Sequence, residues 1–142
     1  MNQFESSIKQ IPYSQQRVFD KLSDLTNLEQ FTGLLQQEQE KAKLKVEDLA
    51  FDADSVRCSI APVGKLELRI VERDEPKCVK FEATTSPIPL TLWIQILPVA
   101  EETSKMKLTL RTELNIFVKG MLQKPLKEGV EKLAEVLSQI PY

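Results

Sequence analysis

Residues 117–140, FVKGMLQKPLKEGVEKLAEVLSQI, decide the fold that this chain can adopt. Apolar residues recur there every three or four positions, with lysine and glutamate on the opposite side, which is typical of an amphipathic helix. At ~1.5 Å per residue the helix would be roughly 35 Å long, enough to cross a small domain. Its apolar stripe consists of Leu122, Leu126, Val130, Leu133, Leu137 and Ile140.

Pro125 lies inside this pattern and lacks the N–H that would bond to the carbonyl of Met121. We therefore expect a kink or a break at 121–125. Gly120 also lowers the helix propensity of the part before the proline. The expected result is a short mobile segment at about 117–123 and a rigid segment from 125 onward.

The stretch from about 45 to 115 changes to a period of two, which predicts β-strands separated by turn residues. Its connections are short and favour an antiparallel meander, because parallel neighbours need crossovers of about a dozen residues. The six predicted strands lie at about 46–51, 55–61, 65–73, 79–84, 92–96 and 106–111. The face expected to point inward carries Val56, Cys58, Ile60, Leu66, Leu68, Ile70, Phe81, Ala83, Leu92, Ile94, Met106, Leu108 and Leu110.

The N-terminal part has a different pattern, which predicts a strand followed by a short helix. Residues 4–11 alternate loosely, which predicts a first strand with Phe4 and Ile8 on the same face. Ser14 is a candidate N-cap for a short amphipathic helix at about 15–23.

A second short helix is predicted after Asn27, its candidate N-cap. The polar stretch 36–43 carries almost no apolar residue and is interpreted as a solvated loop or a frayed helix end. The apolar positions of this helix are Leu28, Phe31, Leu34 and Leu35.

Together these elements predict one domain of the α+β class over residues 1–142. A sheet with one apolar face must cover that face, and only the C-terminal helix has an apolar stripe long enough to do so. We expect a curved antiparallel sheet of about seven strands wrapped around the C-terminal helix, with two short helices after the first strand.

Two stretches resemble a known superfamily. FESSIKQIPYSQQRVFDKLSDLTNLEQF (residues 4–31) is similar to the opening of SRPBCC proteins, and PLKEGVEKLA (residues 125–134) resembles their final helix. This superfamily includes START domains, pollen allergens, aromatic polyketide cyclases and coenzyme-Q-binding proteins. The resemblance covers nearly the whole chain and implies a helix-grip fold with an apolar ligand between helix and sheet.

We expect a binding or carrier domain for a small hydrophobic or amphipathic molecule, such as a lipid, a polyketide or a quinone. We expect it to be non-enzymatic, because none of the inward residues is a credible acid or base at neutral pH. The alternatives are an enzyme of the cyclase or hydrolase type and a protein-interaction module that uses the convex face of the sheet. The same inward residues would also suit a packed core without a cavity. The predicted ligand-binding residues are Phe31, Leu34, Leu35, Cys58, Leu68, Ile70, Phe81, Leu92, Ile94, Leu108, Leu110, Met121 and Leu122.

Among these residues, Phe31, Leu34 and Leu35 are expected at the cavity mouth. Met121 and Leu122 are expected to form a movable wall near the proline.

Composition excludes several classes of protein. The 142 residues contain no histidine, which rules out serine triads and histidine-based zinc sites. The net charge of −2 predicts no binding of nucleic acid. No apolar run is long enough to span a membrane, and no signal peptide is apparent, so we expect a cytoplasmic protein. Neither catalytic residues nor a metal or other cofactor are predicted.

Three side chains carry further expectations. Cys58 should point inward and Cys78 outward, so both are expected to be reduced and unbonded. Trp93 alternates with inward neighbours and should lie on the convex face. There it either forms a homodimer contact or lies under the long side chains of Lys107 and Arg111.

Overall fold

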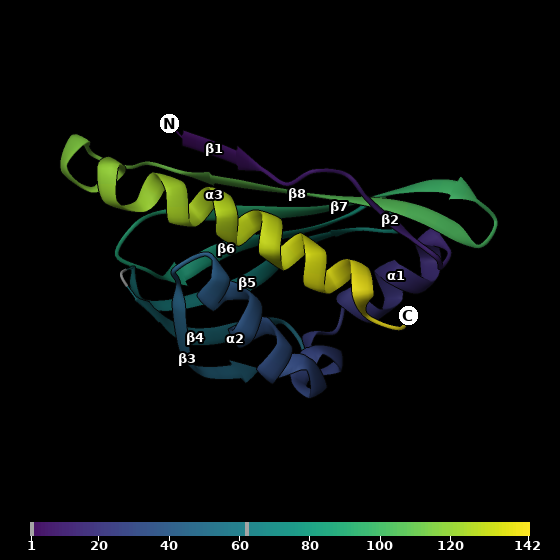
Figure 1. The fold of residues 1–142 in the computed structure, drawn as a ribbon. Coiled ribbons are helices and arrows are strands. Elements are labelled where there is room, and N and C mark those ends of the chain that lie inside the picture. The colour runs from purple at the N-terminus through teal and green to yellow at the C-terminus, as the bar shows by residue number, and fades with distance from the viewer. Residues whose placement is uncertain (1, 62) are drawn as a thin grey trace.

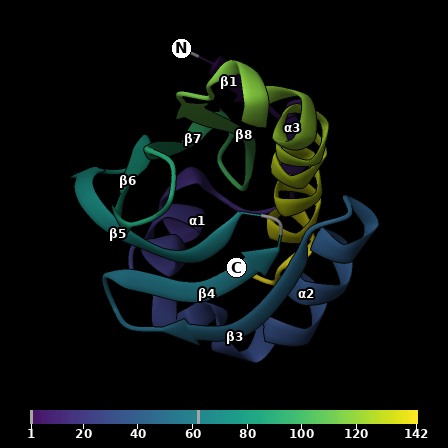
Figure 2. The ribbon, with the colours of Figure 1, turned by 90° about the vertical axis from the view of Figure 1, so that its left-hand side faces the viewer.

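The computed structural model describes residues 2–61 and 63–142. It consists of a curled antiparallel sheet that wraps around one long helix, with shorter helices packed beside it (Figures 1 and 2). The elements are β1 (Asn2–Glu5), β2 (Lys9–Ile11), α1 (Gln15–Leu22), the 3-10 helix η1 (Leu25–Phe31), α2 (Thr32–Lys41), β3 (Lys45–Phe51), β4 (Ser55–Ala61), β5 (Gly64–Asp74), β6 (Cys78–Thr85), β7 (Leu90–Ala100), β8 (Thr103–Thr112) and α3 (Ile116–Gln139).

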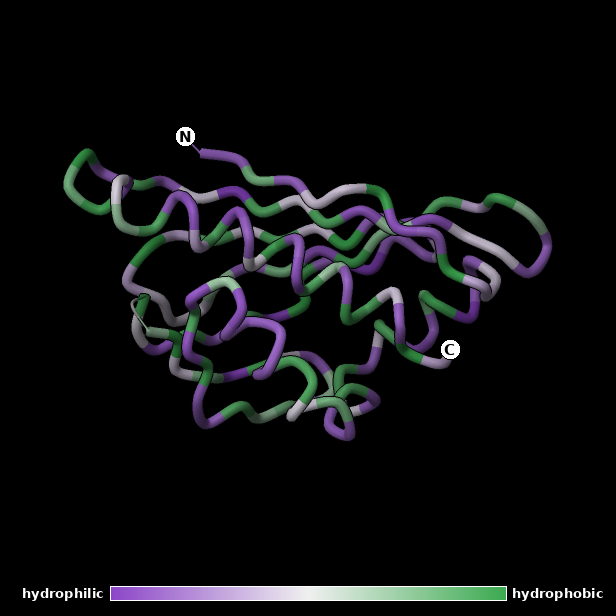
Figure 3. The backbone as a smooth tube through the Cα atoms, in the orientation of Figure 1, coloured by the Kyte–Doolittle hydropathy of each residue, from purple (hydrophilic) through white to green (hydrophobic). Residues whose placement is uncertain are grey.

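The sheet has the strand order β1-β8-β7-β6-β5-β4-β3, and β2 also pairs with β8. The meander predicted for residues 46–111 is therefore confirmed, and β1 closes the far edge. Register aligns the apolar side chains in rows, so that Phe4, Leu110, Leu92, Phe81 and Ile70 are neighbours across five strands. All five are buried, which gives the sheet one continuous apolar face. Figure 3 shows this alternation of hydropathy along the strands.

The predicted first strand is split into β1 and β2. Between them, the Ser6 N–H donates to the Leu108 carbonyl, and the Leu108 N–H donates to Ser6 Oγ, each at 2.9 Å. This interruption changes the alternation, because an inserted residue moves those that follow it to the other face. Ile8 is 62% exposed, so the prediction that it shares a face with the buried Phe4 is wrong.

The cap of α1 is confirmed, since Ser14 Oγ accepts from the Arg17 N–H. The second helix differs from its prediction. Asp24, and not Asn27, caps a 3-10 helix, and α2 then continues through residues predicted to be a loop or a frayed end. Long polar side chains hold α2 in place, because the Gln36 side chain donates to the Val46 carbonyl and that of Gln39 to the Gly129 carbonyl.

α3 is one uninterrupted helix across the concave face of the sheet (Figure 1). Asn115 caps it by accepting from the N–H groups of Phe117 and Val118. Pro125 lies within the helix and does not break it, so of the kink or break expected at 121–125 the break is absent. In the described part of the chain, no helix is long and apolar enough to cross a bilayer.

Side chains of α1 attach the C-terminal end of α3 to the rest of the protein. Beyond its C-terminal end, two side chains of α1 hold the last residues: Arg17 donates to the Tyr142 carbonyl and Lys21 to the Pro141 carbonyl. The Tyr142 hydroxyl also returns to the helix and donates to the Leu137 carbonyl at 2.6 Å. The C-terminal end of α3 is therefore anchored to α1.

On the convex face, Trp93 is half-buried under two cations. Lys80 Nζ and Arg111 Cζ lie 5.6 and 5.1 Å from its ring centroid. Arg111 was expected there, whereas Lys80 takes the place predicted for Lys107. Lys107 instead pairs with Glu5 on β1.

Candidate functional site

An apolar cavity of about 200 Å³ lies between α3 and the concave face of the sheet. The apolar stripe of α3 forms one wall, and strands β3 to β8 form the opposite wall. η1, α2 and Leu44, which lies between α2 and β3, contribute the rest. The lining residues of the helices are Leu25, Leu28, Leu35, Gln39, Leu126, Gly129, Val130, Leu133 and Leu137. Those of the strands include Val46, Phe51, Val56, Cys58, Ile60, Leu66, Leu68, Phe81, Leu90, Leu92, Ile94 and Leu110.

Local sequence explains why these side chains converge. Along α3, Leu126, Val130, Leu133 and Leu137 are three or four positions apart and therefore lie on one side of the helix. Along each strand, every second residue points to the concave side. Because the helix crosses that side, the two apolar sets meet face to face.

The lining contains two polar side chains, Gln39 and Cys58. The Gln39 amide nitrogen is held by the Gly129 carbonyl at 3.1 Å. Burial raises the pKa of the Cys58 thiol to about 11, so it stays protonated at neutral pH. No charged side chain lines the cavity within the described residues. A charged ligand group would thus find no counter-ion, which favours an uncharged occupant.

The wall formed by α3 is held against the sheet by Glu131. Its carboxylate accepts from the backbone N–H and the hydroxyl of Ser7, at 2.7 and 2.8 Å, and pairs with Lys9. Partial burial by itself would raise the pKa of Glu131, but these bonds outweigh it and lower the pKa to about 2. Glu131 therefore joins the outer side of α3 to the β1–β2 segment.

Seven of the thirteen predicted ligand-binding residues line the cavity: Leu35, Cys58, Leu68, Phe81, Leu92, Ile94 and Leu110. The others lie elsewhere. Ile70, Leu108 and Leu122 are buried in the packed core, and Phe31 and Leu34 are half-buried outside the lining.

Met121 is 55% exposed and lies outside the cavity, so the expected movable wall at Met121 and Leu122 is not where the cavity is. Successive residues of a helix are turned by about 100° from each other. Met121 therefore points to solvent, while Leu122 points into the core.

Sequence reasoning did not select Gln39, Leu44 or Gly129 as site residues, although all three line the cavity. A Cβ added to Gly129 would lie 2.7 Å from Leu44 Cδ1 and 3.0 Å from Gln39 Oε1. The end of α2 thus approaches α3 closely because position 129 has no side chain. Gly129, next to the stripe residue Val130, was a local signal of this contact in the sequence.

Comparison with known proteins identifies solved structures of similar architecture. No family model matches the sequence, and no curated protein matches it. TTHA0849 from Thermus thermophilus is 20% identical, with a TM-score of 0.61 over 97% of this chain and 95% of that one. A START superfamily protein from Mycobacterium smegmatis is 10% identical, with a TM-score of 0.56 over 95% and 98%. The chain has the START-like helix-grip fold.

A third similar structure of this START-like fold is norcoclaurine synthase from Thalictrum flavum in complex with dopamine and hydroxybenzaldehyde. It is 10% identical, with a TM-score of 0.60 over 99% of this chain and 89% of that one. At such identities the likeness shows the fold alone. The fold implied by residues 4–31 and 125–134 is therefore confirmed, and the chemistry of the cavity has to be argued from its own residues.

Proposed function

We propose that this START-like domain binds and carries a small, uncharged, apolar molecule in the cavity between α3 and the sheet. The observation that carries the proposal is the cavity itself, about 200 Å³ with an almost wholly apolar lining. An apolar occupant would remove both its own surface and that of the lining from water, which is favourable by ~25 cal/mol per Å² of apolar area buried.

The volume limits the size of the ligand. An engineered apolar cavity of ~150 Å³ binds benzene, whereas pockets for drug-sized molecules measure roughly 300–1,000 Å³. The volume here is about 200 Å³. We therefore propose a molecule with one or two rings, or the short apolar part of a larger lipid, polyketide or quinone.

The lining supports binding over catalysis. General acid–base chemistry needs a group that exchanges a proton near neutral pH. The polar side chains in the lining are an amide, Gln39, and a thiol, Cys58, whose pKa lies near 11. The convex-face alternative has less support, because Lys80 and Arg111 lie over Trp93.

The experiment uses naphthalene as a probe and two phenylalanine substitutions on β4. Cys58→Phe fills the cavity, whereas Arg57→Phe places the same side chain at the neighbouring exposed position as a matched control. We expect naphthalene to raise the Tm of the parent and of Arg57→Phe, because a ligand that binds only the folded state stabilises it. Cys58→Phe should lose this shift while keeping its far-UV circular dichroism.

No shift in the parent, or equal shifts in both variants, would contradict the proposal. Native mass spectrometry of the purified protein adds a second readout, since a retained small apolar molecule should be present in the parent and absent from Cys58→Phe.

A further inference from the structure

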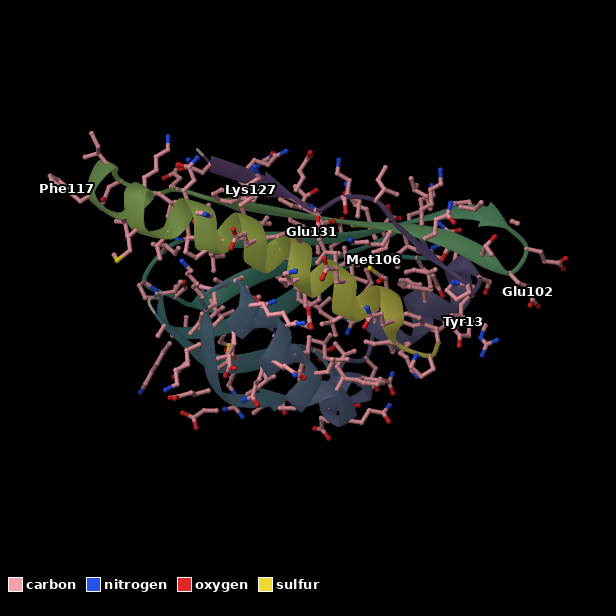
Figure 4. The ribbon with its side chains drawn as sticks, in the orientation of Figure 1. Tyr13, Glu102, Met106, Phe117, Lys127 and Glu131 are labelled. Atoms are coloured by element: carbon pink, nitrogen blue, oxygen red, sulfur yellow. The ribbon has the colours of Figure 1, made fainter. Side chains whose placement is uncertain are left out.

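The first turns of α3 form an exposed apolar surface at one end of the molecule. Ile116 is 84% exposed, Phe117 90% and Met121 55%. Figure 4 shows Phe117 pointing away from the rest of the protein, at the opposite end of α3 from the anchored C-terminus. Burial normally removes side chains of this kind from water, and grouped exposure of this kind marks an interaction site.

Three exposed lysines, Lys119, Lys124 and Lys127, lie in the same half of α3 as this apolar surface. No acidic residue occurs between positions 114 and 127, and Glu113 and Glu128 flank this stretch. In the described residues, none of the three lysines has a carboxylate within ion-pair distance. We call the six side chains the α3 tip: Ile116, Phe117, Lys119, Met121, Lys124 and Lys127.

The charges of α3 are unevenly distributed. Lys119, Lys124 and Lys127 lie in its first half, whereas Glu128, Glu131, Lys132 and Glu135 lie in its second half. The first half therefore carries positive charge only, which complements a partner with negative charge.

We propose that the α3 tip docks on an anionic lipid surface. Ile116, Phe117 and Met121 would enter the boundary between headgroups and acyl chains, and the three lysines would contact the headgroups. This combination of exposed apolar side chains with lysines is what binds helices to anionic membranes. Each lysine near such a surface strengthens binding about fivefold.

A second copy of the chain fits the α3 tip less well. A stable protein interface buries about 800 Å² on each partner, far more than three side chains offer. A twofold dimer through this surface would also bring the two sets of lysines together. Charge complementarity therefore favours the lipid surface.

The location of the α3 tip relates it to the cavity. Leu126, which lies between the tip residues Lys124 and Lys127, lines the cavity, and Asn115, the cap of α3, follows the lining residue Leu110 by five residues. A docked tip would bring this end of the cavity close to the membrane. The inference does not depend on the proposed function, because docking requires only the outer side of α3.

The test is flotation of the whole protein with phosphatidylcholine vesicles, with and without phosphatidylserine. We expect binding to the vesicles that contain phosphatidylserine, weakened at high salt because screening reduces the attraction. Lys124→Glu combined with Lys127→Glu should weaken binding about tenfold or more. Far-UV circular dichroism and the Tm of this variant should match those of the parent, so that lost binding does not reflect lost folding.

Phe117→Ser, in the α3 tip, should reduce binding severalfold. Its matched control is Leu97→Ser, which replaces an exposed apolar residue outside the tip and should not reduce binding. Lys105→Glu is the control for the charge reversals. Cys58→Phe should bind vesicles like the parent, which separates this test from that of the cavity.

Equal binding with and without phosphatidylserine, or equal losses in Phe117→Ser and Leu97→Ser, would overturn the proposal. So would a dimer in solution that dissociates on Phe117→Ser while the parent ignores vesicles, since the partner would then be a second copy.

Discussion

Glu131 connects α3 to the β1–β2 segment, and its replacement tests that connection. Glu131→Gln removes the ion pair with Lys9 and weakens the bonds from Ser7. We expect a loss of about 1 kcal/mol in the free energy of unfolding at pH 7, measured by urea denaturation. Glu128→Gln, one turn earlier and without an ion partner among the described residues, is the control and should change little.

The same carboxylate predicts a pH dependence. Its pKa is about 2 in the folded state, below the ordinary value of 4.5, so its stabilisation is fully present above that value. As pH falls from 4.5 towards 2, the stabilisation is lost, and the difference between parent and Glu131→Gln should shrink to nearly nothing. A difference that stays constant over this range would contradict the assignment.

Gly129 and Gly120 offer a matched pair of substitutions within α3. Alanine at an exposed helical glycine gains up to ~1 kcal/mol, and Gly120 has open space around it. At Gly129 the new methyl would contact Leu44 and Gln39 closely, and overpacking costs ~1–3 kcal/mol. We expect Gly120→Ala to raise the urea midpoint and Gly129→Ala to lower it. If both variants raised the urea midpoint, the end of α2 would have moved away from the new methyl group without loss of stability.

At the scale of the element, Pro125 weakens the first half of an otherwise continuous α3. The proline leaves the Met121 carbonyl without its helical donor, which costs up to ~3 kcal/mol. Amide hydrogen exchange should therefore be faster across 117–123 than across 128–138. Pro125→Ala should slow exchange in the first segment and stabilise the protein by about 1–3 kcal/mol, whereas Lys124→Ala, the neighbouring control, should do neither. Equal exchange rates in both segments of the parent would contradict the prediction that the first half of α3 is mobile.

At the scale of the whole molecule, the cavity can be tested without a ligand by comparing two leucines on adjacent strands. Leu108 is fully buried in packed core, whereas Leu92 lines the cavity. A side chain beside empty space has fewer packing partners to lose. We expect Leu108→Ala to cost about 4–5 kcal/mol and Leu92→Ala about 2–3 kcal/mol in urea denaturation. Equal losses would indicate that the space beside Leu92 is filled in solution.

The strands at 65–73, 79–84, 92–96 and 106–111, and the helix that follows them, could be predicted because their periods of 2 and 3.6 are local properties of the chain. The same is true of the Ser14 cap. Such patterns indicate which side of an element is apolar. Because the apolar sides of the sheet and of α3 must cover each other, the sheet is expected to curl around the helix.

Other features depended on partners distant in sequence. Ser6 changes the phase of the first strand by bonding to Leu108, and α2 continues because Gln39 reaches the Gly129 carbonyl. Leu92 and Leu108 are equivalent in the sequence pattern, yet one lines the cavity and the other does not. For the strands after position 45 and for α3, the sequence by itself determined which side chains face inward. Only the tertiary structure decided where they leave space, because a cavity depends on how whole elements approach one another and no single element encodes that distance.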